Sequence, residues 1–379
     1  MSVYVIGKEP GISIVAKSLY DSDGLSVIAW DEIFRNSSNG LIINKQDTVI
    51  LAFNNKKMQQ AVKTWILAEF SVCEDNILEK DTIDSFVLPR MKVDRVFSVE
   101  SNYKGLVLGL SHAKVGILPE LVPIQLADLT VSAQDIFYNF ETLEYAQKKY
   151  GDRLTEIQYT IYDVFDYTYL NYDCSLSNNA ISYFEWGGFA SEHNFSRNKN
   201  VTVSYLEAQK SIMTNCIIDT QIDLVERLFD RNKYIKNQLV WGEDVMNRRW
   251  KPCSEELISA YDGDNSLVSK RFEKTIEENT VYLRKTIEML YRINPNMKIF
   301  LIIFPHLPMA CKKINEKYSL WKDMFYSYMS SLENKYNVNF LDFKICDEFD
   351  DKLYFDDCEH LNYFGARKFT TLLNDVIKW

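Results

Sequence analysis

The sequence lacks an excess of positive charge, and this absence excludes one broad class of partner. The chain holds 43 lysines and arginines against 53 aspartates and glutamates, so its net charge is −10. A protein whose main partner is nucleic acid needs a basic face to neutralise phosphates. We therefore expect no nucleic-acid partner.

Long apolar runs and paired cysteines are also missing. No apolar stretch approaches the roughly 20 residues of a bilayer-spanning helix, and the first residues are typical of a strand rather than a signal peptide. The seven cysteines are scattered and form no Cys-x-x-Cys motif, which favours free thiols over a disulfide framework. These features predict a soluble, cytoplasmic protein without a membrane span.

The common signatures of bound metals and dinucleotides are absent as well. No group of histidine, cysteine and acidic residues has the spacing of a metal site. Gly7 and Gly11 follow the first apolar segment, but they do not form the Gly-x-Gly-x-x-Gly fingerprint, and no acidic residue is clearly placed for a ribose. Two interpretations of this N-terminal region stay open: a scaffold or docking domain, or a domain with a nucleotide ligand.

The chain is longer than one compact domain usually is, so we predict two domains. Residues 91–102 are polar and charged without periodicity, and we interpret them as a linker. The second domain then covers residues 103–379, with a helical and loop insertion around 178–265. Before the linker, residues 1–90 alternate short apolar segments with helical patterns, which predicts a small Rossmann-like α/β domain with strands at 3–6, 25–29, 48–53 and 83–88.

The second domain also alternates strands and helices, which predicts a parallel sheet. Its strands are expected at residues 105–109, 127–131, 158–164, 298–304 and 338–341. One helix is expected to follow residue 135 and to end at about residue 149, and two more are expected at 268–292 and 319–335. The final helix is expected to bury Phe369, Leu372, Leu373, Val376 and Ile377.

Ser111 lies where an apolar strand meets a helix start. The strand at 105–109 leads directly into Leu110 and Ser111. Open α/β folds keep their chemistry at the carboxyl edge of the sheet, and a serine at this place presents its hydroxyl there. The alternative is that Ser111 merely caps the following helix, as serine commonly does.

Asp357 and His360 lie in a short polar segment between the last predicted strand and the final helix. An aspartate three residues before a histidine can direct its carboxylate at one imidazole nitrogen and leave the other free as a base. Asp356 is an alternative partner, but the spacing favours Asp357. The other three histidines are expected to be packed or solvated: His112, His193 and His306.

These segments resemble the SGNH (GDSL-type) hydrolase and acyltransferase superfamily over about residues 103–379. Gly109-Leu110-Ser111 matches the block that carries the nucleophile, and Asp357-Cys358-Glu359-His360 matches the closing block. Ser132-Ala133-Gln134-Asp135, followed by Phe137 and Tyr138, is similar to the second block of polysaccharide-linked bacterial members. The sequence has no Gly-x-Ser-x-Gly at Ser111, which speaks against the elbow of α/β-hydrolases.

The resemblance implies a three-layer, flavodoxin-like domain and a serine-dependent acyl transfer. Ser111 is then the nucleophile, His360 the base and Asp357 its orienting partner, and the backbone amides of Ser111 and Ser132 form the oxyanion hole. The family's third block usually supplies an Asn from a Gly-x-Asn-Asp motif. After the third strand this chain has instead Tyr162-Asp163-Val164-Phe165-Asp166, which puts that third donor in doubt.

Two functions from different classes follow from these observations. The first is a carbohydrate O-acyl esterase or O-acetyltransferase of bacterial surface-glycan (polysaccharide) metabolism. It needs no cofactor, except an acyl donor such as acetyl-CoA if the reaction is a transfer. The 23 tyrosines and 22 phenylalanines suit stacking on sugar rings. The alternative is a non-catalytic glycan-binding, nucleotide-sugar-binding or scaffold protein built on a degenerate SGNH fold.

Overall fold

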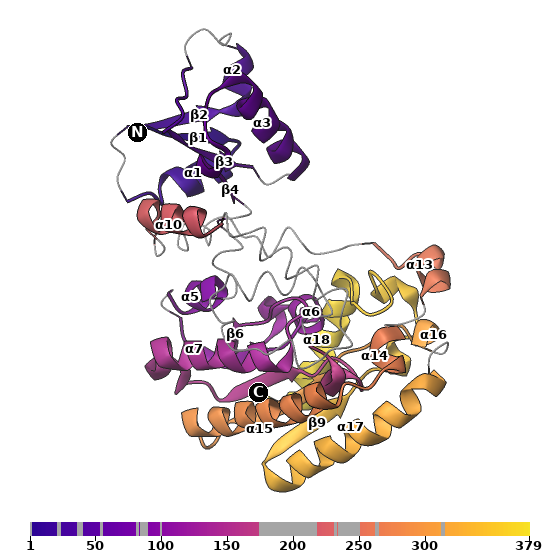
Figure 1. Ribbon diagram of the computed structural model, residues 1–379. Coiled ribbons are helices and arrows are strands. Elements are labelled where there is room, and N and C mark those ends of the chain that lie inside the picture. Colours follow the sequence, from indigo (N-terminus) through magenta and orange to yellow (C-terminus); the bar gives the residue numbers. More distant parts are fainter. Residues whose placement is uncertain are drawn as a thin grey trace. The chain divides into compact units, whose positions relative to one another are not determined.

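The chain forms two compact units, Met1–Ser98 with Gln209–Glu243 and Val99–Ala208 with Asp244–Trp379. Figure 1 shows the computed structural model, and each unit is described by itself below. The structure describes residues 2–20, 24–35, 41–53, 56–80, 83, 90–98, 101–173, 218–230, 233, 251–261, 265–311 and 315–379.

The first unit contains a sheet of four parallel strands in the order β2-β1-β3-β4. The strands are β1 (Val3–Gly7), β2 (Leu25–Ala29), β3 (Thr48–Ala52) and β4 (Ile77–Glu79). The sequence placed the fourth strand at 83–88. Of that range only Ile83 is described, and it is helical, while residues 84–88 lie outside the described part. The strand that pairs with β3 is β4, where Ile77 and Leu78 are the buried apolar pair.

Alternating side chains of this sheet bury two opposite faces, as the period of two in a strand requires. Ile6 and Val49 pack with the apolar side of α3 (Lys56–Glu69), while Val5 and Ile50 pack with α1 (Gly11–Ala16). A short helix, α2 (Trp30–Arg35), follows β2. Both faces of the sheet are therefore covered, which explains why β3 is buried along its whole length.

Two segments near the predicted domain boundaries are helices. The segment assigned to a linker contains α5 (Arg90–Ser98), because Val93 and Phe97 are spaced one turn apart and both are buried. The segment assigned to the insertion contains α10 (Ile218–Leu228), whose Leu224 and Val225 join the core of the first unit. The first unit is thus built from two stretches of the chain.

The second unit contains a sheet of five parallel strands in the order β6-β5-β7-β8-β9. This is the flavodoxin-like order 2-1-3-4-5 of doubly wound folds. The predicted α/β class with parallel sheets is confirmed. The strands are β5 (Tyr103–Leu108), β6 (Gln125–Asp128), β7 (Tyr159–Asp163), β8 (Lys298–Ile303) and β9 (Val338–Asp342).

Helices cover both faces of this sheet. The helix α7 (Ile136–Leu154) lies beside α15 (Glu273–Ile293) on one face, and α6 (Ser111–Gly116) packs with α18 (Tyr363–Ile377) on the other (Figure 1). The long helix α17 (Asn315–Lys335) contacts β9. Three shorter helices complete the described part: α13 (Glu255–Ala260), α14 (Asn265–Ser269) and α16 (Pro308–Cys311).

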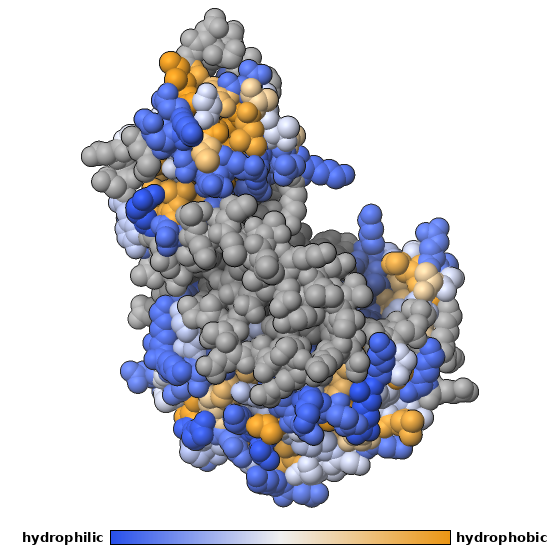
Figure 2. Space-filling model, in the orientation of Figure 1, coloured by the Kyte–Doolittle hydropathy of each residue, from blue (hydrophilic) through white to orange (hydrophobic). Residues whose placement is uncertain are grey.

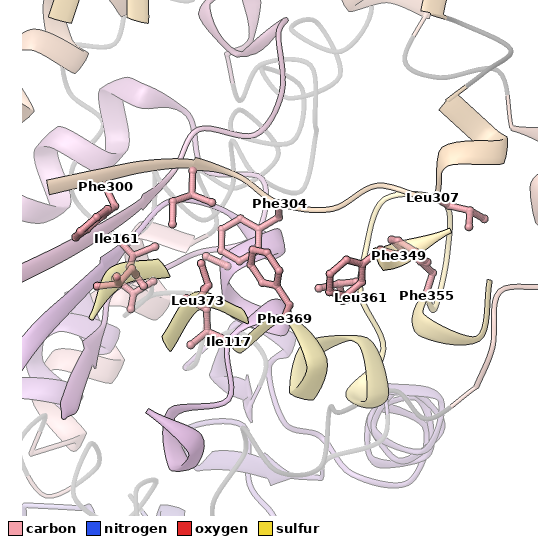
Figure 3. Close-up of a cluster of buried hydrophobic side chains, with 14 of the residues drawn as sticks. Ile117, Ile161, Phe300, Phe304, Leu307, Phe349, Phe355, Leu361, Phe369 and Leu373 are labelled. Carbon is pink, nitrogen blue, oxygen red and sulfur yellow. The ribbon is translucent and has the colours of Figure 1, made fainter. Parts of the chain in front are cut away.

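The core under α6 and α18 follows from strand register. Val107, Ile161 and Phe300 are paired across β5, β7 and β8, so their side chains point to the same face. Figure 3 shows Phe369 and Leu373 of α18 among the side chains of this cluster. Of the five residues predicted to be buried in α18, Val376 is 40% exposed, because it lies on the solvent side of the helix.

The surface in view carries mainly hydrophilic residues on the second unit, while apolar residues gather on part of the visible face of the first (Figure 2). Within the described ranges, no helix combines the length and the apolar character that crossing a bilayer requires.

Candidate active site

Ser111 lies just after the carboxyl end of β5, on a backbone turn that requires a glycine at position 109. Gly109 has a φ of +120°, and a Cβ atom there would lie 2.4 Å from the Cβ of Asp163. The N-cap of α6 is Leu110, so Ser111 is the first helical residue and does not cap the helix. The structure therefore excludes the capping interpretation of Ser111.

Two buried polar side chains hold this turn from below. Asp163 Oδ2 accepts hydrogen bonds from the backbone N–H groups of Leu110 (3.3 Å) and Ala113 (3.0 Å). Asn139 Oδ1 accepts one from the N–H of Gly109 (2.8 Å). Sequence reasoning missed both residues, although Asp163 was visible at the end of the third strand.

The segment with Asp357 and His360 is a closed turn before α18. Phe355 and Leu361 form an antiparallel bridge, and the N–H of Asp356 donates to the carbonyl of His360 (2.9 Å). Asn362 caps α18 by accepting from the N–H groups of Phe364 and Gly365, and its own amide donates to the carbonyls of Leu353 and Phe355. The turn is thus fixed at both ends before any substrate arrives.

The structure brings Ser111, His360 and Asp357 into one hydrogen-bonded chain. Ser111 Oγ lies 2.7 Å from His360 Nε2, and His360 Nδ1 lies 3.0 Å from each carboxylate oxygen of Asp357. The side chains of His360 and Asp357 are 23% and 34% exposed, so both residues of this hydrogen-bonded chain are partly accessible to solvent. Asp356 does not take the place of Asp357 beside the imidazole.

The charge on Asp357 fixes the histidine tautomer. Burial alone would raise the pKa of this carboxyl, but the hydrogen bond and charge of His360 and the N–H groups of Glu359 and His360 hold it well below its usual range. An ionised carboxylate only accepts hydrogen bonds, so Nδ1 carries the imidazole proton. His360 Nε2 therefore offers a lone pair to the hydroxyl of Ser111.

Ser132 lies in a turn that is tied to the same edge of the sheet. The N–H of Val131 donates to the carbonyl of Gly109 (3.2 Å), two residues before Ser111. Ala133 has a φ of +57°, and its carbonyl accepts a hydrogen bond from the hydroxyl of Tyr172 (2.8 Å). A non-glycine residue in this conformation is strained, and such strain is often found at functional sites.

At the end of β7, where the sequence resemblance predicts an asparagine donor, Asp163 supplies an acceptor. Asp163 Oδ1 accepts the N–H of Phe165 (2.9 Å), in addition to the two bonds to the Ser111 turn. Burial raises the pKa of Asp163 to about 6, against the opposing effect of these backbone N–H groups. At neutral pH its carboxylate therefore serves as an anchor and not as an oxyanion donor.

Two of the other histidines are buried beside His360. His112 is 3% exposed and His306 is 0% exposed, and both belong to a stack of rings with His360. The third, His193, lies outside the described residues. Cys358 is buried in the core, where burial first of all raises the pKa of its thiol to about 12. It is therefore a poor nucleophile, although it lies inside the motif.

The aromatic residues of the second block are not available to a sugar. Phe137 and Tyr138 are 3% and 0% exposed and pack edge to face against each other. Their place in the core is what the ordinary burial of aromatic side chains predicts.

The first turn of the N-terminal unit is shaped by packing. A Cβ atom at Gly7 would lie 2.2 Å from the carbonyl oxygen of Ala52, and one at Gly11 would lie 2.6 Å from the same atom. The carboxylate of Glu9 accepts hydrogen bonds from the N–H and hydroxyl of Ser13, at the start of α1. A negative charge thus occupies the place where a phosphate would bind.

Over the described ranges, no group of three or more histidine, cysteine and acidic side chains is placed to hold a metal ion.

Comparisons with known proteins give sparse matches. A family model without a functional description matches residues 247–379. Curated proteins give no match. One solved structure, described as "a putative platelet activating factor from Streptococcus pneumonia", shares 13% sequence identity and a TM-score of 0.38, and the alignment covers 86% of this chain and 100% of that chain.

Proposed function

We propose that this protein is a serine-dependent esterase or acyltransferase of the SGNH type, with Ser111 as nucleophile, His360 as base and Asp357 as its orienting partner. The observation that carries the proposal is the hydrogen-bonded chain from Ser111 Oγ through His360 to Asp357. The three residues come from two segments separated by more than half of the sequence. A hydroxyl, an imidazole and an ionised carboxylate in this order are the components of nucleophilic acyl transfer.

The reaction begins when Ser111 Oγ attacks an ester or thioester carbonyl. His360 Nε2 takes the hydroxyl proton, and the carboxylate of Asp357 stabilises the imidazolium that forms. The imidazolium then gives this proton to the leaving oxygen or sulfur. The acyl group stays on Ser111 until water or a second hydroxyl removes it, with His360 again acting as the base.

The developing oxyanion is held, in this proposal, by the backbone amides of Ser111 and Ser132. Ser111 is the first residue of α6, where N–H groups have no partner within the helix. A third donor from Asp163 is not expected, because its carboxylate already accepts three backbone N–H groups. The lack of one such donor costs about 10²–10³ in rate.

The substrate that we propose is an O-acylated carbohydrate, or an acyl donor with a carbohydrate acceptor. This assignment depends on the resemblance of residues 132–138 to polysaccharide-linked members of the superfamily. The buried state of Phe137 and Tyr138 removes these two rings as a sugar platform.

A fluorophosphonate probe tests the serine. We expect one covalent adduct in the intact mass of the wild-type protein and none in Ser111→Ala. The matched control is Ser132→Ala, which keeps the backbone amide and should keep the adduct. A folded wild-type protein that gains no adduct would refute the proposal and favour the non-catalytic binding or scaffold function.

The acyl acceptor needs a separate experiment. The protein is incubated with acetylated mono- and oligosaccharides, and in parallel with acetyl-CoA and the unacetylated sugars. Release of acetate indicates an esterase, and a sugar whose mass rises by one acetyl group indicates a transferase. If Ser111→Ala performs either reaction as fast as the wild type, the product does not come from this site.

A further inference from the structure

Three imidazole rings from separate segments form a column beside Ser111. The ring of His112 lies parallel to that of His360, with 4.5 Å between centroids and 3° between planes. His112 also stacks on His306, with 5.3 Å between centroids and 10° between planes. His112 comes from α6, His306 follows β8, and His360 belongs to the closing turn. The fold therefore places these rings together, although His112 is far from His306 and His360 in the sequence.

The rings of His112 and His306 are buried, and burial favours their neutral form. Burial lowers the pKa of His112 well below its ordinary value, and the charges of His360 and His306 act in the same direction. Burial likewise lowers the pKa of His306, with Lys344 and His360 contributing. Neither ring nitrogen of His112 has a hydrogen-bond partner among the described residues, and the nearest carboxylate oxygen, Asp163 Oδ2, is 3.7 Å away.

An unpaired buried imidazole calls for a physical explanation, because buried polar groups are normally hydrogen-bonded. A leucine would fill the same space without unpaired nitrogens. What a leucine lacks is an aromatic face, which attracts a cation placed over it. His360 becomes such a cation when it takes the proton of Ser111. The flat contact also keeps the His360 ring in the plane that reaches Ser111 and Asp357 at once.

We propose that His112 is a positioning residue whose neutral ring orients His360 between Ser111 and Asp357 and stabilises its protonated form, with His306 supporting the stack. This inference rests on the proposed acyl transfer, because it assigns His112 a role in the proton transfer at that site. It goes beyond the three residues of the hydrogen-bonded chain. Phe165 packs against His112 at 5.2 Å and closes the column on another side.

The titration of His360 reports directly on this contact. The chain contains only four histidines, so histidine labelled with ¹⁵N gives a simple imidazole spectrum. The His360 signals are assigned by their loss in His360→Ala. The charged groups around the column stay the same in every variant at position 112: Asp163, Asp166, Lys344, Asp357 and Glu359.

The test compares His112→Leu with His112→Phe. In His112→Leu the aromatic face is lost, and we expect the midpoint of the His360 titration to fall by about 0.5–1 pH unit. In His112→Phe the face is kept without the nitrogens, and the midpoint should stay within about 0.3 unit of the wild type. The rate of fluorophosphonate labelling should fall in the leucine variant and be largely kept in the phenylalanine variant.

A folded His112→Leu protein with an unchanged His360 midpoint would overturn the inference, and so would a wild-type His112 that takes up a proton together with His360. His112→Met serves as a second apolar variant if the leucine variant does not fold, since methionine adapts to irregular cavities. The midpoint is read without a substrate. A wild-type protein that shows this coupling but gains no fluorophosphonate adduct would therefore refute the acyl transfer alone.

Discussion

Asp163 makes the stability of the second unit depend on pH, with a sign opposite to that of a salt-bridged carboxylate. Burial raises its pKa from the ordinary value of 3.8 to about 6. Between these two values the folded protein holds a proton that the unfolded chain has released. Stability is therefore expected to decrease as the pH rises through this window.

The magnitude follows from the size of the shift. About two pKa units at roughly 1.4 kcal/mol each give about 3 kcal/mol. In Asp163→Asn the titrating group is gone, so the variant lacks this contribution. Part of this contribution is already lost below pH 4, so we expect the free energy of unfolding of the wild type, minus that of Asp163→Asn, to fall by about 2.5 kcal/mol between pH 4 and pH 7. Most of the change should occur between pH 4 and pH 6.

Urea unfolding followed by tryptophan fluorescence at four pH values measures this difference. Asp152→Asn is the matched control, because Asp152 is an exposed aspartate on α7. The change for Asp163→Asn is read against the change for Asp152→Asn over the same pH range. A change for Asp163→Asn no larger than that for Asp152→Asn would refute the reasoning, because it would mean that Asp163 is equally ionised in the folded and unfolded states.

Two further substitutions test the site and the interior of the second unit. Asp357→Asn should leave the fold intact and lower the rate of fluorophosphonate labelling by about 10⁴, since the histidine tautomer is no longer fixed. Labelling reactions quenched at successive times measure this rate, and a rate within tenfold of the wild type would contradict the prediction. Lys344 pairs with Asp166 at 2.9 Å in the interior, so Lys344→Met should cost about 3–5 kcal/mol in urea unfolding. The double variant Lys344→Met, Asp166→Leu should recover most of that loss, and a double variant as unstable as the single one would be the contrary result.

The strands of both sheets could be predicted where apolar runs are long and clearly bounded. The run ending at Phe304 is followed by Pro305, and β8 occupies Lys298–Ile303 as expected. β6 was placed at 127–131 but occupies Gln125–Asp128, because its edge position leaves Gln125 exposed and weakens the apolar pattern. The sequence thus predicts that these strands exist, but the bounds of short edge strands also depend on how they pair in the sheet.

The helices α5 and α10 show where local pattern fails. The buried apolar side chains described in α5 are Val93 and Phe97, and they lie in a charged context that resembles a linker. α10 has an apolar side, but nothing local indicates that Leu224 and Phe229 pack with residues near position 15. Such contacts depend on the fold of the whole unit, which a single sequence does not display.

Some residues of the candidate site could be proposed from local motifs, whereas others depend on contacts between distant segments. The sequence could propose Ser111, Asp357 and His360 as one site because each lies in a short motif with a known spacing, and the structure places the three side chains within hydrogen-bonding distance. Asn139 and Asp163 could not be proposed in this way, since they act on backbone groups that lie 30 and 53 positions earlier in the chain. The stacking of His112 was also hidden, because its partners come from two distant segments.

Asp163 links the shape of the nucleophile turn to the chemistry expected of it. Two backbone N–H groups of the Ser111 turn and that of Phe165 share one acceptor, and the Asp163 carboxylate provides it where an asparagine would bring a donor. These bonds restrain the turn, and the proposed oxyanion hole then consists of the two backbone amides of Ser111 and Ser132. A site of this kind should react with strong acyl or phosphonyl electrophiles but release its acyl group slowly, because the same hole stabilises the second transition state. We therefore expect the acyl group on Ser111 to last long enough to be seen by intact mass.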